Sequence, residues 1–406
     1  MTVTPIRSDT AATPARDAAQ GRLAPLARDD FDRDLWCVLG LPIDMVNVHE
    51  ASDLVRTAVR DRRRLSIVTP NVNWLVRALR NETARREILN ADLSLADGAP
   101  IAAFARLLGA PLKRRAAGAD LFDALREKPA VAGRKLRVFF FGGRDGAAEA
   151  AAAALDADNG ALEAAGALNP GHGDVESMSG AGVIDAINAA AADFVAVALG
   201  AAKGQAWIER NKDRLWAPVI GHFGAVVDFV AGTKARAPIW LRRLGLEWAW
   251  RIREEPALLR RYRTDGVALA SIVGTRLLPQ VLVRALRTMR VKPGAAVNHA
   301  AGKVTILLSG DLGGGSLAAI RGAFREAAAA KGDVTLDFSA AGRVDGAFLG
   351  LVLMLEKQVR ARGGAIATAG LSWSQRALFK ANAMNYPAAS AVNALGEAAP
   401  RSAPAA

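Results

Sequence analysis

The chain has 406 residues, of which 51% are hydrophobic and 23% are charged, and its formal net charge at pH 7 is +13. At roughly 100–200 residues per domain, this length predicts two or three domains with ample apolar residues for buried cores. The single cysteine, Cys37, excludes disulfides within the chain and fits a reducing cytoplasm. The four histidines lack metal-ligand spacing, so we expect neither a metal nor a cofactor.

The N-terminal 34 residues are rich in Ala, Pro, Arg and Asp and contain no continuous apolar segment. This composition predicts a disordered leader rather than a secretory signal. The arginines are compatible with an organelle transit peptide, but the number of aspartates argues against one.

The first predicted elements after the leader form a strand–helix–strand unit. Residues 65–68 and 93–96 are apolar strands, and residues 74–90 between them carry apolar side chains at helical spacing. Strands joined through a helix are parallel, so their C-terminal ends lie at the same edge of a sheet.

Polar residues follow both strands where they end. Thr69 and Asn71 follow the first strand, and Asp97 follows the second, 28 positions after Thr69. Ligands bind outside the carboxyl ends of strands in open α/β sheets, so we expect these three side chains to share one crevice. The alternative is local: Thr69 and Asn71 would cap the next helix, and Asp97 with Gly98 would form a turn.

Three further apolar strands continue the pattern, and each is followed by glycine and a segment with helical spacing. They are residues 136–141, 194–199 and 218–220. Near-continuous apolar strands that alternate with helices predict a mostly parallel, Rossmann-like α/β sheet covered on both faces.

The positive charge is concentrated in residues 236–290, which contain twelve arginines and four acidic residues. The arginines alternate with tryptophans and leucines, which favours a surface for an anionic partner, such as acidic lipids or a phosphorylated substrate, over a solvated face. Nucleic acid is a further anionic partner, but the region has no recognisable RNA- or DNA-binding motif, so we expect none.

Residues 267–289 are a candidate membrane segment. They are apolar apart from three arginines and Gln280, and Pro279 interrupts them. A spanning helix needs about 20 predominantly apolar residues and tolerates central charges poorly. We therefore predict an amphipathic helix, broken near Pro279, that lies on a membrane surface. The alternative is a helix buried against its own domain.

A second, smaller α/β domain follows a linker at residues 292–295. Its elements, in chain order, are strand 303–309, helix 316–331, strand 334–338, helix 347–362, strand 365–369 and a helix around Leu378 and Phe379. The complete division is a disordered leader (1–34), a first domain (35–265), an amphipathic appendage with linker (266–296), a second domain (297–393) and a disordered tail (394–406).

A series of short motifs runs through the first domain. They are Thr69-x-Asn71, Ala91-Asp92 with Asp97-Gly98, Arg115-x-x-Gly118-x-Asp120-Leu121, Gly221-x-x-Gly224-x-x-x-Asp228-Phe229-x-x-Gly232, Arg236-Ala237-Pro238-x-Trp240, Leu246-Glu247-Trp248-x-x-Arg251, Pro256 and Arg261-Tyr262. In this order, over about 230 residues, the first domain resembles the WecG/TagA/CpsF glycosyltransferases (glycosyltransferase family 26). No single motif is specific, but the ordered series is.

The resemblance implies a parallel α/β sheet with a helical C-terminal appendage that closes over the site. It implies an inverting, metal-independent glycosyltransferase that moves a hexose or N-acetylhexosamine from a UDP-sugar to a polyprenyl-diphosphate-linked saccharide. Such a step belongs to bacterial exopolysaccharide or other cell-envelope polysaccharide synthesis. The expected location is cytoplasmic, peripheral on the inner face of the cytoplasmic membrane.

The residues agree with this chemistry. Inverting transfer needs a base that accepts the proton of the attacking hydroxyl, and Asp97 at the end of a strand is the best candidate. We place Thr69 beside it as a catalytic residue. The hydroxyl of Thr69 and the amide of Asn71 suit the hydroxyls or N-acetyl group of a donor sugar.

The departing diphosphate develops negative charge, which guanidinium groups can neutralise without a metal. Arg115 fits the family's Arg-x-x-Gly-x-Asp-Leu motif, and the appendage adds Arg251, Arg261 and Arg263. Asp228 suits the uridine or ribose hydroxyls.

One segment departs from the family pattern. The family reads Gly-x-Pro-x-Gln-Glu after its fourth strand, whereas residues 200–205 read Gly-Ala-Ala-Lys-Gly-Gln. Gln205 could replace the lost side chain in substrate binding after a local shift of the backbone. The alternative is a catalytically silent scaffold or regulatory protein of an envelope-polysaccharide complex.

The second domain resembles the STAS domains of anti-sigma-factor antagonists and sulfate-transporter tails. The matching residues are Val344-Asp345-Gly346-Ala347 at the start of a helix, followed later by Leu378-Phe379 and Met384. In signalling members a phosphorylatable Ser or Thr follows the Asp, whereas Gly346 and Ala347 stand there in this chain. The resemblance therefore implies a protein-docking or structural role without a phosphorylation switch at this position.

Overall fold

The computed structural model describes residues 29–127, 133–285, 291–300, 303–314 and 317–389. They divide into two compact units: the first contains the residues up to Asp34 and Leu41–Gly274, and the second contains Leu35–Gly40 and the residues from Thr275 onward. The predicted tail (394–406) and most of the predicted leader (1–34) lie outside the described residues.

The first unit is built on a six-stranded parallel sheet with the order β4-β3-β8-β7-β5-β6. Its strands are β3 (Leu65–Val68), β4 (Leu93–Ser94), β5 (Leu136–Gly142), β6 (Leu162–Leu168), β7 (Phe194–Ala198) and β8 (Val219–His222). The predicted parallel α/β sheet is confirmed. β6 is not among the predicted strands, because it contains only two large apolar side chains, Leu162 and Leu168.

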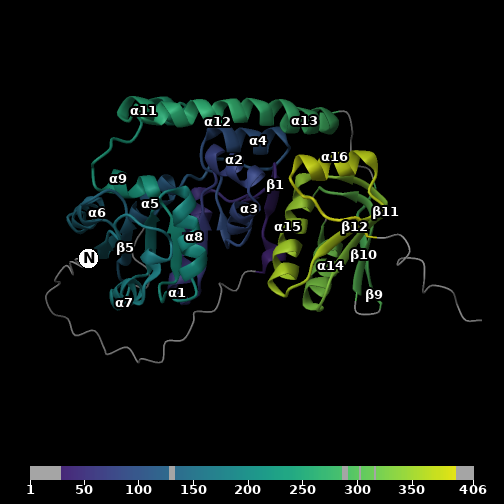
Figure 1. Cartoon of the computed structure of the whole chain (residues 1–406), viewed down its shortest axis with the longest axis horizontal. Helices are drawn as coiled ribbons and strands as arrows, with labels where there is room; N and C mark the ends of the chain where they lie inside the picture. Colours follow the sequence, from purple (N-terminus) through teal and green to yellow (C-terminus); the bar gives the residue numbers. More distant parts are fainter. Residues whose placement is uncertain (1–28, 128–132, 286–290, 301–302, 315–316, 390–406) are drawn as a thin grey trace, which may run out of the picture. The chain divides into compact units, whose positions relative to one another are not determined.

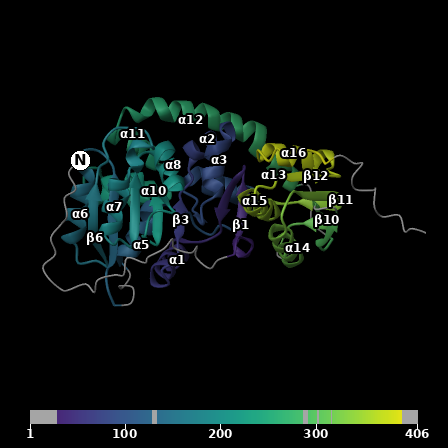
Figure 2. The same cartoon turned by 60° about the horizontal axis from the view of Figure 1, so that its bottom comes forward.

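Helices cover both faces of this sheet (Figures 1 and 2). Side chains alternate along a strand, so Val138 and Phe140 of β5 join one buried cluster and Phe139 and Phe141 join another. The first cluster is covered by α1 (Val48–Arg60), α5 (Gly118–Glu127), α6 (Ala147–Asp156) and α9 (Gly224–Val230), and the second by α7 (Ala181–Ala189) and α8 (Ala201–Asn211). A sheet that is buried on both sides explains the nearly continuous apolar strands.

The helix predicted between β3 and β4 is two helices, α2 (Val72–Arg80) and α3 (Glu82–Leu89). Asn81 between them has an extended backbone, and its side chain accepts a hydrogen bond from the Ala84 N–H at 3.0 Å. Asn81 thus ends one helix and caps the next, which the apolar spacing alone does not reveal. The unit continues after β4 with α4 (Ala99–Leu107).

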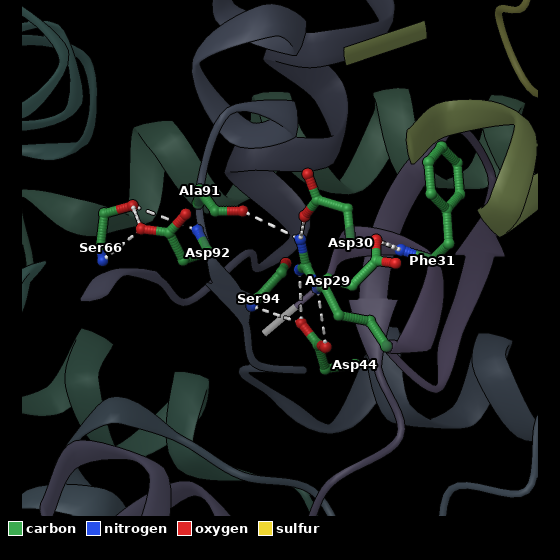
Figure 3. Close-up of polar contacts among 9 residues, drawn as sticks. Asp29, Asp30, Phe31, Asp44, Ser66, Ala91, Asp92 and Ser94 are labelled. Carbon is green, nitrogen blue, oxygen red and sulfur yellow. Dashed lines mark hydrogen bonds and ion pairs between the residues drawn. The ribbon is translucent and has the colours of Figure 1, made fainter. Parts of the chain in front are cut away.

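A buried polar network holds β4 beside β2 (Leu41–Asp44) in the first unit. The Arg33 guanidinium pairs with Asp44 at 2.7 Å and with Asp30 at 3.1 Å, and it also donates to the Ala91 carbonyl. Asp44 accepts a further hydrogen bond from the Ser94 N–H (Figure 3). A buried ion pair that is saturated in this way fixes geometry, and losing one partner is expected to cost about 3–5 kcal/mol.

The first unit ends in helices that follow the sheet. They are α10 (Ile239–Arg243), α11 (Glu247–Glu254) and α12 (Leu258–Ile272). α12 continues into a π-helical turn (Val273–Leu277) and α13 (Leu278–Ala285), so that residues 258–285 form one uninterrupted helix.

The predicted break near Pro279 is therefore wrong. Proline lacks an N–H and crowds the carbonyl of the preceding turn, and the π-helical turn that ends at Leu277 loosens the backbone just before it. The Gln280 side chain also donates a hydrogen bond to the Arg276 carbonyl at 2.9 Å. The helix thus passes the proline without breaking.

By length and composition, Leu258–Ala285 is able to cross a membrane. The most apolar 18-residue window of this helix has a mean hydropathy of 1.6, and 17% of the window is buried. Of the predicted segment 267–289, residues 286–290 lie outside the described residues.

The second unit contains a four-stranded sheet with the order β12-β11-β10-β9. Its elements are β9 (Gly294–Ala300), β10 (Lys303–Leu312), α14 (Ala318–Ala329), β11 (Val334–Val344), α15 (Gly346–Ala361), β12 (Ile366–Ala369) and α16 (Trp373–Ala381). β9 pairs with β10 in antiparallel fashion and the other pairs are parallel. The predicted smaller α/β domain is confirmed, although β9 is not among its predicted strands. Figure 2 shows α14 beside α15.

A strand from near the N-terminus, β1 (Leu35–Val38), packs against α15 in the second unit. The contact is too close for a side chain on the helix: a Cβ at Gly346 would lie 1.8 Å from the Trp36 indole nitrogen, and one at Gly350 would lie 2.5 Å from the Leu35 carbonyl oxygen. The two glycines of α15 therefore allow β1 to lie directly on the helix.

Candidate active site

An open cavity of about 230 Å³ lies in the first unit, beyond the carboxyl ends of β3, β4, β7 and β8. Its lining includes Thr69, Asn71 and Asp97 from the sheet edge and Arg251 and Arg261 from the terminal helices. The three polar residues that follow β3 and β4 thus lie in one crevice.

Backbone geometry brings the two polar segments together. The Asp97 N–H donates to the Pro70 carbonyl at 3.1 Å, which ties the end of β4 to the loop after β3. Gly98 then has φ +83°, a conformation that favours glycine, and it starts α4. This turn places the Asp97 side chain in the cavity lining.

Asn71 lines the cavity and also caps a helix. Its Oδ1 accepts hydrogen bonds from the N–H groups of Asn73 (3.1 Å) and Trp74 (3.4 Å), so it caps α2. The capping alternative therefore holds for this residue, and the Nδ2 amine is the part of the amide that could donate to a ligand. Thr69 is buried at the same edge.

The pKa of the Asp97 carboxyl is raised from 3.8 to about 6. Burial is the largest cause, and the negative charges of Glu247 and Asp120 act in the same direction, whereas Arg251 and Arg115 lower the pKa. A carboxylate with a pKa near 6 is mostly ionised at neutral pH and is a stronger base than an ordinary aspartate.

Cationic side chains gather near this carboxylate. Arg115 forms an ion pair with Glu247 at 2.5 Å, which joins α11 to the segment before α5. Arg251 lies 5.8 Å from the Phe229 ring, and Arg261 lies 5.3 Å from the Tyr262 ring. Arg251 and Arg261 thus line the same cavity as the Asp97 carboxylate, which suits a ligand that carries negative charge and hydroxyl groups.

Four residues predicted to bind substrate are not part of the cavity lining, and Arg115, paired with Glu247, is one of them. Gln205 is fully buried, and its amide donates to the Glu87 carbonyl at 3.2 Å, because α8 begins at Ala201 and turns position 205 towards α3. Asp228 forms an ion pair with Lys234 at 2.7 Å. Arg263 is an exposed residue of α12.

The cavity lining also includes residues that sequence reasoning did not select, notably His222 and Trp74. His222 ends β8, and its ring stands edge-on to Trp74 with 5.7 Å between centroids. His222 follows the apolar segment 218–220, and this position at the end of a predicted strand could have identified it as a site residue. No cluster of His, Cys, Asp or Glu arranged to hold a metal ion occurs within the described ranges.

Comparison with known proteins gives two matches along the chain. Residues 36–281 match the sequence profile of the glycosyl transferase WecG/TagA/CpsF family, and residues 295–386 match that of the Mlab, STAS domain.

Two similar proteins carry the name N-acetylglucosaminyldiphosphoundecaprenol N-acetyl-beta-D-mannosaminyltransferase. One, from Bacillus spizizenii, is 30% identical over 210 residues, which cover 52% of this chain and 79% of that protein. Another, from Staphylococcus aureus, is 28% identical over 216 residues, which cover 53% of this chain and 82% of that protein.

Proposed function

Because the chain belongs to the WecG/TagA/CpsF glycosyltransferase family and carries a STAS domain, we propose that it transfers a hexose or N-acetylhexosamine from a UDP-sugar to a polyprenyl-diphosphate-linked saccharide. The names of the two relatives support this acceptor class, since each contains N-acetylglucosaminyldiphosphoundecaprenol and an N-acetylmannosaminyl group. The product would be an intermediate of a bacterial envelope polysaccharide.

The observation that carries the proposal is the carboxylate of Asp97 in a cavity that guanidinium groups also line. An acceptor hydroxyl attacks the anomeric carbon from the face opposite the diphosphate, which inverts the configuration, and its proton passes to Asp97. The bond between the anomeric carbon and the diphosphate breaks, and UDP leaves with the electron pair. A base in this role contributes about 10²–10⁴-fold to the rate.

The leaving group needs positive charge as it departs. Arg251 and Arg261 line the cavity, and Arg115 is close enough to Asp97 to lower its pKa. We therefore assign the developing charge on UDP to these guanidinium groups, which predicts that transfer continues in the presence of a metal chelator. Thr69 and Asn71 would hold hydroxyl or N-acetyl groups of the donor.

The direct test is Asp97→Asn, assayed for transfer from a panel of UDP-sugars to a lipid-diphosphate acceptor. The matched control is Asp185→Asn, because Asp185 is an exposed aspartate of α7 in the same unit. We expect loss of transfer only in the Asp97 variant, with unchanged thermal unfolding in the control. Full activity of the Asp97 variant would contradict its assignment as the base.

A second candidate function is a silent scaffold, favoured by the altered motif at Gly204 and Gln205 and by the added STAS domain. Calorimetric titration of the full chain with UDP separates the two functions. Binding of UDP supports the enzyme, whereas a flat titration supports the scaffold.

We also propose that residues 258–285 bind the inner face of the cytoplasmic membrane. Large apolar side chains are exposed along this helix, namely Leu259, Val267, Leu278, Leu282 and Val283. Arginines interrupt the same helix, which favours a position at the lipid surface over one across the bilayer.

Flotation with vesicles that contain phosphatidylglycerol tests this location. Leu282→Ser with Val283→Ser should weaken vesicle binding by about 2–4 kcal/mol, since each side chain contributes through its buried apolar area. Leu107→Ser is the control, because Leu107 is an exposed leucine of α4. Equal flotation of both variants would contradict the lipid contact.

A further inference from the structure

His222 occupies a position in the cavity that the proposed mechanism does not use. It is the last residue of β8 and is buried, with 9% of its surface exposed. β8 lies next to β3, whose end carries Thr69, and β3 lies next to β4, which leads to Asp97. Since neighbouring strands are about 4.8 Å apart, the ends of β8 and β4 are separated by about 10 Å.

The space for this ring exists because position 204 is glycine. A Cβ at Gly204 would lie 2.3 Å from Cδ2 and 2.9 Å from Nε2 of His222. Any side chain at this position, including the glutamine of the family's pattern, would require the imidazole to move. Glycine is also unfavourable within a helix such as α8, so its presence at position 204 calls for a reason beyond helix formation.

The imidazole has an unused polar atom. Nε2 of His222 is buried and makes no hydrogen bond of normal geometry to any described residue, although backbone groups of Gly200 and of His222 itself interact with the ring. Leaving such an atom unpaired is unfavourable, which points to a partner that arrives with the ligand. Burial lowers the pKa of His222 to about 4, so the ring is neutral at pH 7 and suits an uncharged hydroxyl or amide rather than a phosphate.

We propose that His222, seated in the space left by Gly204, determines donor specificity by hydrogen bonding to a hydroxyl or N-acetyl group of the sugar in the UDP-sugar. This inference rests on the proposed function and goes beyond it by assigning the altered motif a role. The pair replaces a glutamine side chain from α8 by an imidazole from β8. A sugar hydroxyl can both donate and accept a hydrogen bond, so either tautomer of the ring can serve.

The experiment compares the binding of UDP, UDP-GlcNAc, UDP-ManNAc and UDP-glucose to the full-length chain by calorimetry. For His222→Val we expect UDP affinity within about twofold of the parent. The affinity for the preferred UDP-sugar should fall about tenfold, as for one lost hydrogen bond. In transfer assays KM for that donor should rise more than kcat falls, and the ranking of the three donors should change.

A second variant tests the same contact without removing the imidazole, so the test does not depend on whether His222→Val folds. Gly204→Ala retains the imidazole but displaces it, so it should show the same selective loss of sugar binding. Gly182→Ala is the matched control, since Gly182 lies in α7 and a Cβ there meets nothing within 4 Å. Gly204→Gln combined with His222→Val, which restores the glutamine, should recover part of the donor affinity.

The outcomes separate this inference from the function on which it rests. If the parent chain binds UDP and UDP-sugars, and both variants bind them equally well, the role of His222 is wrong while the glycosyltransferase proposal stands. If the variants lose affinity for UDP itself to the same extent, the ring contacts the nucleotide and the sugar assignment is overturned. If the parent chain does not bind UDP, both proposals fall.

Discussion

Each unit of the molecule places an aspartate shortly after a parallel strand, but the two carboxylates have different surroundings. Asp345 follows β11 and accepts hydrogen bonds from the N–H groups of Gly314, Ala347 and Phe348 at 2.9–3.0 Å. Asp97 follows β4, and no hydrogen bond from another described residue reaches its carboxylate. Burial raises the pKa of both groups. A raised pKa is therefore not enough to identify a reactive carboxylate, whereas unused hydrogen-bonding capacity in a cavity is informative.

The largest expected difference between the two aspartates is in catalysis. Asp97→Asn should lower kcat by about 10²–10⁴-fold, because the amide cannot accept the proton of the attacking hydroxyl. Steady-state transfer assays measure this effect, with UDP titration to show that the nucleotide site persists. An equal loss of kcat in Asp345→Asn would remove the distinction between the two sites.

The pH dependence sharpens the assignment of the base. With the pKa of Asp97 at about 6, kcat should fall about tenfold per pH unit below pH 6 and level off above it. A profile that stays flat down to pH 4.5 would show that a different group accepts the proton.

The raised pKa of Asp97 also predicts how the stability of the folded chain changes with pH. The folded state favours protonated Asp97, because the pKa is higher in the fold (about 6) than its ordinary value of 3.8. The ionised form therefore costs stability above pH 6. Asp97→Asn should unfold at a higher temperature than the parent at pH 7.5, and this gain should shrink between pH 6 and pH 4. A lower unfolding temperature at pH 7.5 would contradict this environment.

A smaller effect is expected at the start of α15. Gly346→Ala should destabilise the chain by about 1–3 kcal/mol, since the added carbon overlaps the Trp36 ring. Gly322→Ala in α14 is the control: nothing lies within 4 Å of its Cβ, so it should stabilise the helix by about 1 kcal/mol. Equal thermal unfolding of the two variants would mean that β1 does not press on α15.

The smallest effect concerns the helix cap itself. Asp345→Ala removes the acceptor for the N–H groups of Ala347 and Phe348 and should cost about 1 kcal/mol, or about 4–8 °C for a domain of this size. Transfer activity at 25 °C should stay within about twofold of the parent. Loss of transfer without loss of stability would assign Asp345 a functional role.

Local patterns predicted most of the architecture. The apolar strands and helical spacing gave the parallel sheet, because both depend on residues close together in the chain. These patterns did not predict β6, in which small side chains stand where other strands have large apolar ones. They also predicted a break in the long helix at Pro279, whereas a π-helical turn just before the proline lets the helix continue.

Fewer of the residues that line the cavity could be predicted from such local patterns. Thr69, Asn71 and Asp97 could be selected because each follows a strand, but the direction of Gln205 depends on where α8 starts. The contact between Gly204 and His222 depends on how α8 packs against β8, which single-residue patterns do not encode. The altered motif was recognised in the sequence, yet only the packing relates it to the imidazole.

The segment Leu35–Gly40, which contains β1, belongs to the second compact unit although it precedes the first unit's sheet in the chain. Trp36 fills the space beside Gly346, where a Cβ would lie 1.8 Å from its indole nitrogen. A fragment that begins at residue 291 would lack β1, so the backbone of α15 at Gly346 and Gly350 would be exposed to solvent. Adding a synthetic peptide of residues 29–45 to such a fragment should restore the contact between Trp36 and Gly346.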